Sequence, residues 1–302
     1  MGDSISEQLV NGVLCEAERT GLMLDVTFAA GSAAHAARAA LEARVAAVPT
    51  NDWHDHVQTL AYAPATGTLF CFKGWARFYE KDFQAALSVA EVLVVNYGLH
   101  YNAGSAINLT MYETDMRRLV TLGAAWARAS SAPPRAFLFR ETSAQSFLHT
   151  GSFDVAAAAA GGNVGSRDWE YACAPPAKID SGAVDWVDVR NGIVRRLVTA
   201  LKDPKGVHVL PWQATTRARW DQLVGSRCQF KLPLLRRDKL PPGAILDTTD
   251  HKVWDEAWLP SSRSQTGHDH CSDCTHFCWT PLLYAAFVDT LAAAVERALS
   301  EH

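Results

Sequence analysis

The chain has 302 residues, of which 48% are hydrophobic and 20% are charged, a composition typical of globular proteins. A net charge of -4 argues against a nucleic-acid partner. No apolar run reaches the roughly 18 to 20 residues of a membrane span, and the first residues lack the pattern of a signal peptide.

The first predicted element is a helix over residues 5–19, where apolar residues recur at helical spacing. Ser4 would then lie at or just before the helix N-terminus, where backbone N–H groups and the helix dipole favour negative charge. Such a position suits a nucleophilic serine and its oxyanion. It equally suits a serine that only caps the helix.

Strands and helices are predicted to alternate along the rest of the chain. The predicted strands cover 24–28, 68–72, 90–95, 135–139 and 207–211, and the predicted helices 33–47, 83–89, 103–129, 187–201 and 280–299. This alternation predicts a single α/β domain over 1–302, with a mostly parallel sheet covered on both faces. The stretches 151–185 and 237–264 are predicted to be long irregular excursions.

Polar residues follow several of the predicted strands. Asn96, Gly98 and His100 follow the strand 90–95, Gly74 follows the strand 68–72, and Arg140 follows the strand 135–139. Because ligands in open α/β sheets bind at the carboxyl ends of the strands, the polar segment 96–102 is a candidate for a binding site.

The segment 268–278 concentrates three histidines, three cysteines and Asp273. In one interpretation Cys271 and Cys274 begin a zinc site, to which Cys278 and the histidines His268, His270 and His276 could add ligands. In the other, Asp273 and His276 are the acid and base of a Ser-His-Asp hydrolase, and the cysteines form disulfides.

The seven cysteines leave the compartment open. They are Cys15, Cys71, Cys173, Cys228, Cys271, Cys274 and Cys278. An oxidising compartment would allow three disulfides and one remaining thiol, so all seven are disulfide candidates, whereas a reducing one would keep them as buried thiols.

Several short segments of the chain together resemble the SGNH (GDSL-like) superfamily. The resemblance lies in Gly2-Asp3-Ser4 and in Asp273-Cys274-Thr-His276-Phe-Cys278, which is similar to the D-C-x-H-W-C motif of the PC-esterase and trichome birefringence-like branch. Asn96-Tyr-Gly98-Leu-His100 and Arg140-Glu-Thr-Ser143 are similar to further steps of that branch. The resemblance implies a flavodoxin-like three-layer α/β/α fold and acyl-ester chemistry on a glycan.

Carried over residue by residue, the resemblance makes Ser4 the nucleophile, His276 the general base and Asp273 the residue that orients the imidazole. Asn96, Gly74 and the Ser4 backbone N–H would form the oxyanion hole. His100 and Arg140 are placed on the substrate side, although an arginine in that position more commonly anchors a loop or a carboxylate.

The implied activity is that of a carbohydrate O-acetyltransferase, with a carbohydrate acetyl esterase as the alternative. The partner would be a glycan or another hydroxyl-bearing acyl acceptor, and no cofactor is needed beyond an acetyl donor such as acetyl-CoA for a transferase. A rival of another class is a non-catalytic glycan-binding or zinc-binding protein on the same fold.

The chain departs from the family pattern in two places. Phe277 replaces the usual tryptophan, and only Met1 precedes Gly2, where the family has a buried strand. We therefore expect an upstream strand, after a signal or membrane anchor, and by resemblance a location in the Golgi lumen or outside the cell.

Overall fold

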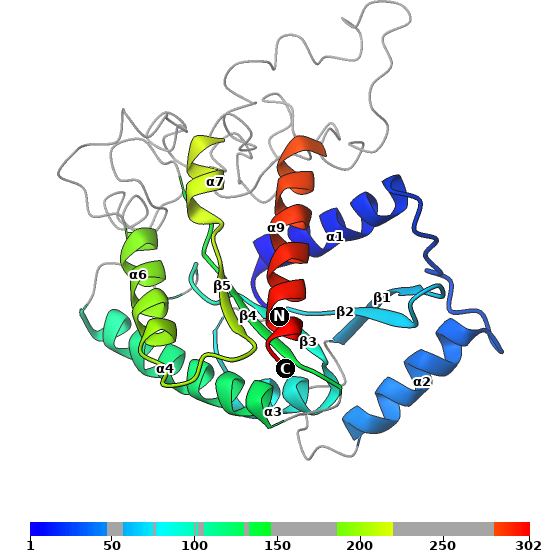
Figure 1. Ribbon diagram of the computed structural model, residues 1–302, viewed down its shortest axis with the longest axis horizontal. Helices are drawn as coiled ribbons and strands as arrows, with labels where there is room; N and C mark the ends of the chain where they lie inside the picture. Colours follow the sequence, from blue (N-terminus) through cyan, green and yellow to red (C-terminus); the bar gives the residue numbers. More distant parts are fainter. Residues whose placement is uncertain are drawn as a thin grey trace, which may run out of the picture.

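The computed structural model describes residues 1–46, 57–74, 77–99, 101, 106–129, 133–145, 186–219 and 281–302 (Figure 1). The predicted excursions 151–185 and 237–264 and the segment 268–278 lie outside the described residues.

The described part is a mixed α/β structure, as predicted. Its helices are α1 (Ser4–Arg19), α2 (Ala33–Ala46), α3 (Glu80–Val89), α4 (Ala106–Arg128), α6 (Trp186–Thr199), α7 (Gln213–Ala218) and α9 (Pro281–Ser300). Its strands are β1 (Val57–Ala63), β2 (Thr68–Lys73), β3 (Val92–Val95), β4 (Ala136–Arg140) and β5 (Val207–Leu210). Among the described helices, none combines the length and hydrophobicity needed to cross a membrane.

The central sheet is parallel, with the strand order β3-β4-β5. Its middle strand β4 is buried along its whole length, which matches the continuous apolar run expected of a parallel strand covered on both faces. Phe137 and Phe139 join the core formed with α3, α4 and α6, whereas Leu138 joins a second cluster with α9. Because successive side chains of a strand point to opposite faces, β4 contributes residues to two separate cores.

Helix α9 crosses the second face of the sheet, and α1 packs beside it (Figure 1). The two helices meet at Gly12, where a Cβ atom would lie 2.1 Å from the ring of Tyr284. Glycine at this position lets the two helices pack closely.

The first two residues join the central sheet to a separate hairpin. Met1 N donates to Val94 O at 2.7 Å and Asn96 N donates to Met1 O at 3.0 Å, the pattern of a parallel ladder. On the other side Gly2 N donates to Lys73 O at 3.1 Å, and Gly2 forms a parallel bridge with Gly74. Met1 and Gly2 thus lie between β3 and the end of β2.

Residues 24–28 do not form the predicted strand. The Asp25 carboxylate accepts hydrogen bonds from Thr27 N at 2.9 Å and Phe28 N at 3.2 Å, and Phe28 has φ 49°. These local bonds close a turn, and only Asp25 pairs with a strand, through Tyr62.

Two elements were not predicted. Strand β1 pairs antiparallel with β2, so the hairpin departs from the expected mostly parallel sheet. Pro64 to Gly67, between two segments of strand-forming residues, was the available hairpin signal. The six-residue helix α7 is too short to give a periodic pattern.

Candidate active site

Three of the predicted site segments meet around Met1 and Gly2, beside the ends of β2 and β3. The backbone of Gly2 lies between Lys73, which precedes Gly74, and Asn96, which follows β3. Gly74 and Asn96 therefore flank Met1 and Gly2, directly before the start of α1 at Ser4.

Asp3 caps α1 and so sets where the helix begins. Its Oδ1 accepts hydrogen bonds from Ser6 N at 3.1 Å and from the Ser6 hydroxyl at 3.3 Å, and its carbonyl accepts Glu7 N at 3.2 Å. The N-cap role considered for Ser4 thus belongs to Asp3, and Ser4 is the first residue of the helix. We call residues 3–7 the capping turn.

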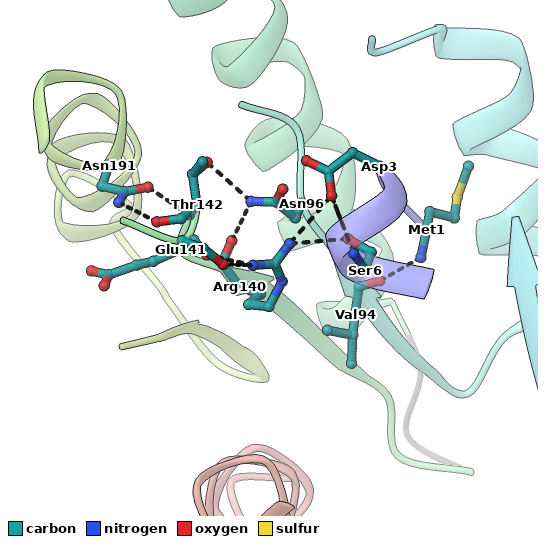
Figure 2. Close-up of polar contacts among 10 residues, drawn as sticks. Met1, Asp3, Ser6, Val94, Asn96, Arg140, Glu141, Thr142 and Asn191 are labelled. Atoms are coloured by element: carbon teal, nitrogen blue, oxygen red, sulfur yellow. Dashed lines mark hydrogen bonds and ion pairs between the residues drawn. The ribbon is translucent and has the colours of Figure 1, made fainter. Parts of the chain in front are cut away.

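Arg140 reaches the capping turn from the end of β4. Its Nη2 donates to Ser6 Oγ at 3.0 Å and lies 3.6 Å from Asp3 Oδ1, in a pair whose side chains are 2% and 1% exposed. Its Nη1 donates to the Glu141 carbonyl at 2.9 Å and to Ser143 Oγ at 3.3 Å. The predicted substrate-side arginine is therefore buried, with its guanidinium directed at protein groups (Figure 2).

Asn96 is buried and its amide nitrogen is fully engaged. Nδ2 donates to Arg140 O at 2.8 Å and to Thr142 Oγ1 at 3.2 Å, which uses both of its hydrogens. Its Oδ1 is buried and has no hydrogen-bond partner among the described residues. To act as the predicted oxyanion donor, Asn96 would have to exchange one of these bonds.

Thr142 is held by Asn191 of α6. Asn191 Oδ1 accepts Thr142 N at 2.8 Å, and Asn191 Nδ2 donates to Thr142 O at 3.0 Å. The Thr142 side chain also packs on Gly98, where a Cβ atom would lie 1.9 Å from Thr142 Oγ1. The segment after β4 is therefore fixed against both α6 and the loop after β3.

Glu141 connects the same segment to α7. Its Oε2 accepts Trp212 N and Gln213 N, each at 3.0 Å, and its Oε1 accepts Arg195 Nε at 2.6 Å. Because no side chain of α7 caps that helix, the Glu141 carboxylate satisfies its first N–H groups.

The loop after β3 is anchored by Arg190. This buried side chain donates to Gly98 O at 2.6 Å and also to Tyr101 O. Tyr101 in turn donates its hydroxyl to Asp115 at 2.7 Å and accepts Phe78 N at 3.1 Å. His100, the predicted substrate-side histidine of this loop, lies outside the described residues.

Two cationic groups beside Asp3 have altered acidity. Burial lowers the pKa of the Arg140 guanidinium to about 10, with the Asp3 carboxylate opposing the shift. Burial, followed by the charge of Arg140, lowers the pKa of the Met1 amine from 8.0 to about 5. Near neutral pH the guanidinium is therefore charged, whereas the amine is mostly neutral.

The rest of the predicted site lies outside the described residues. This applies to Asp273, to His276 and to the cysteines Cys173, Cys228, Cys271, Cys274 and Cys278. The two described cysteines, Cys15 and Cys71, are exposed free thiols. Within the described ranges no group of three His, Cys, Asp or Glu side chains could hold a metal ion.

Three residues of the site were not part of any motif quoted from the sequence: Ser6, Arg190 and Asn191. For Arg190 and Asn191 a signal existed, because they share the core-facing side of the predicted helix 187–201 with Val187 and Val194, three or four residues away. Two polar residues on an apolar helix face require buried partners.

Fold and site define an α/β protein with a polar network at the carboxyl ends of its parallel strands. Comparison of the chain with family models, curated proteins and solved structures found no match.

Proposed function

We propose that this chain is an SGNH-type enzyme with a flavodoxin-like three-layer α/β/α fold, and that it transfers or hydrolyses acyl esters on glycans. One observation carries the proposal: Gly74 and Asn96, which follow β2 and β3, flank Met1 and Gly2 directly before the start of α1 at Ser4. Nucleophile and oxyanion groups must share one such location to act on a single carbonyl.

In the proposed reaction His276 removes the proton from the Ser4 hydroxyl as the oxygen attacks the acyl carbon. Asp273 keeps the imidazole in the tautomer that accepts this proton. Collapse of the tetrahedral intermediate breaks the ester bond, and the leaving hydroxyl takes the proton from His276. Water or a sugar hydroxyl then attacks the acyl-enzyme, giving hydrolysis or transfer.

The oxyanion would form beside the backbone N–H of Ser4 and the residues Gly74 and Asn96. To donate a hydrogen bond to the oxyanion, Asn96 Nδ2 would have to give up one of its two present acceptors. The contact with Thr142 Oγ1, at 3.2 Å, is longer than that with Arg140 O, at 2.8 Å, and is the one we expect to be exchanged. Removing one such donor typically costs roughly 3 to 4 kcal/mol in the transition state.

The test is covalent labelling of the protein by a fluorophosphonate, with Ser4→Ala and His276→Ala as variants. We expect labelling at Ser4, and each substitution should reduce ester turnover by about 10⁴-fold, because the triad acts as a unit. Ester turnover that persists in Ser4→Ala would show that the nucleophile is elsewhere. Acetate release compared with acetyl transfer, on acetylated and bare glycans, separates esterase from transferase.

The same experiment addresses the non-catalytic alternatives. A chain that binds glycans but is not labelled would be a binding protein on this fold. Stoichiometric zinc, released on denaturation, would assign the cysteines of the segment 268–278 to a metal site instead of disulfides.

A further inference from the structure

We propose that Arg140 is a positioning residue, which holds the capping turn, and thereby the backbone of Ser4, against the end of β4. The inference deepens the proposed function. It rests on that function only in giving Ser4, which the turn positions, the role of nucleophile. It differs from the substrate-side role, because it requires no contact between Arg140 and substrate.

The guanidinium of Arg140 forms contacts on two sides. Arg140 is 2% exposed, and its two terminal nitrogens are directed at Ser6 and Asp3 on one side and at Glu141 O and Ser143 on the other. A side chain so buried and so engaged holds two pieces of backbone together (Figure 2).

On the side of α1, Arg140 contacts two residues of the capping turn. Asp3 and Ser6 lie on either side of Ser4 along the chain, and they are joined to each other by two hydrogen bonds to Asp3 Oδ1. Because Asp3 and Ser6 both contact Arg140, the turn is tied to the end of β4 on both sides of Ser4.

Ser6 also packs closely against Gly2. A Cβ atom on Gly2 would lie 2.2 Å from Ser6 Oγ and 2.8 Å from Asn96 O. The Ser6 hydroxyl therefore occupies the space beside Gly2, between the guanidinium and the capping carboxylate. Loss of its arginine partner would free the hydroxyl to rotate and the turn to shift.

The experiment compares Arg140→Met, Arg140→Lys and Ser6→Ala with the parent. It measures hydrogen exchange of the peptide covering residues 2–10, the rate of fluorophosphonate labelling, and kcat and KM on 4-nitrophenyl acetate. In Arg140→Met we expect faster exchange and slower labelling, each by roughly tenfold or more, because small misplacements of a reacting group are costly. Arg140→Lys should recover part of both.

Arg195→Met is the matched control. Arg195 also donates to a buried carboxylate after β4, that of Glu141, but its contacts lie with Gln213 and Asp188, away from the capping turn. This variant also loses one positive charge from the same network, yet exchange of residues 2–10 should stay within about twofold of the parent.

Ser6→Ala keeps the test valid if Arg140→Met does not fold, since it leaves Asp3 and Arg140 in place. We expect a change of about fivefold in exchange and labelling, the value of one hydrogen bond. Parent-like exchange and labelling in Ser6→Ala and Arg140→Lys would overturn the proposal. A higher KM with unchanged kcat in Arg140→Lys would also overturn it, because that pattern marks direct substrate contact.

Failure of the proposed function gives a different result. If the parent is not labelled at Ser4, the acyl chemistry fails, and hydrogen exchange alone then decides whether Arg140 holds the turn.

Discussion

At the scale of single residues, the Asp3 carboxylate makes two interactions that different substitutions can separate. It caps α1 through Ser6 N, and it faces the buried guanidinium of Arg140 at 3.6 Å. An asparagine keeps an oxygen for the cap but removes the charge, whereas an alanine removes both.

We predict that Asp3→Asn lowers the free energy of unfolding by roughly 3 kcal/mol, because it leaves Arg140 buried and unpaired. Asp3→Ala should cost about 1 kcal/mol more, the value of an N-cap. Chemical denaturation measures both differences. Glu42→Gln is the control, because it breaks an exposed pair with Arg38 whose side chains are 59% and 49% exposed, and it should change stability little. Equal stability of Asp3→Asn and the parent would contradict the pairing.

At the scale of elements, packing distance gives the same substitution opposite effects in two helices. Gly12 of α1 lies against Tyr284 of α9, and a Cβ atom on Gly12 would lie only 2.1 Å from the tyrosine ring. Gly192 of α6 has only Arg196 Nη1 nearby, at 3.7 Å, an ordinary contact distance.

We predict that Gly12→Ala destabilises the protein by roughly 1 to 3 kcal/mol, because overpacking outweighs the higher helix propensity of alanine. Gly192→Ala should instead stabilise it by up to about 1 kcal/mol. Thermal and chemical unfolding of the two variants provide the comparison. Adding Tyr284→Ala to Gly12→Ala should relieve the crowding, so the two changes would be non-additive. Equal effects of the two glycine substitutions would show that α1 and α9 are not closely packed here.

At the scale of the whole molecule, the two sheets meet at Met1 and Gly2, and this junction contains a titratable amine. The pKa of the Met1 amine is about 5 in the folded chain and 8.0 in the reference state. Between these values the unfolded chain binds more protons than the folded chain, so the stability contributed by this group rises with pH. It is complete above pH 8 and is lost as the pH falls through 5.

We therefore predict that the 302-residue chain gains up to about 1.4 kcal/mol of stability per pH unit from this amine between pH 5 and 8. A chain acetylated at Met1, or extended by residues that continue the pairing beside β3, carries an amide there and should lack this contribution. The difference between blocked and free chains cancels the titration of the histidines. Parallel stability curves for the two forms would show that the amine is not buried as described.

The sequence by itself determined the elements that depend on local patterns. Helices α1, α4 and α9 follow from the helical spacing of their apolar residues, and β4 from a continuous apolar run. The α/β class follows from their alternation. Asn96 could be predicted as a candidate site residue because ligands bind where the strands of open α/β sheets end, whereas Gly74 and Arg140 were candidates only through the family resemblance.

Only the tertiary structure decided which of these residues meet. Ser6 and Arg140 are 134 positions apart, and Thr142 and Asn191 are 49 apart, so no local pattern relates either pair. The hairpin of β1 and β2 and the insertion of Met1 beside β3 likewise depend on hydrogen bonds to distant backbone. A local period determines which face of an element is buried, but the partner that satisfies a buried charge or amide is chosen by the packing of the whole chain.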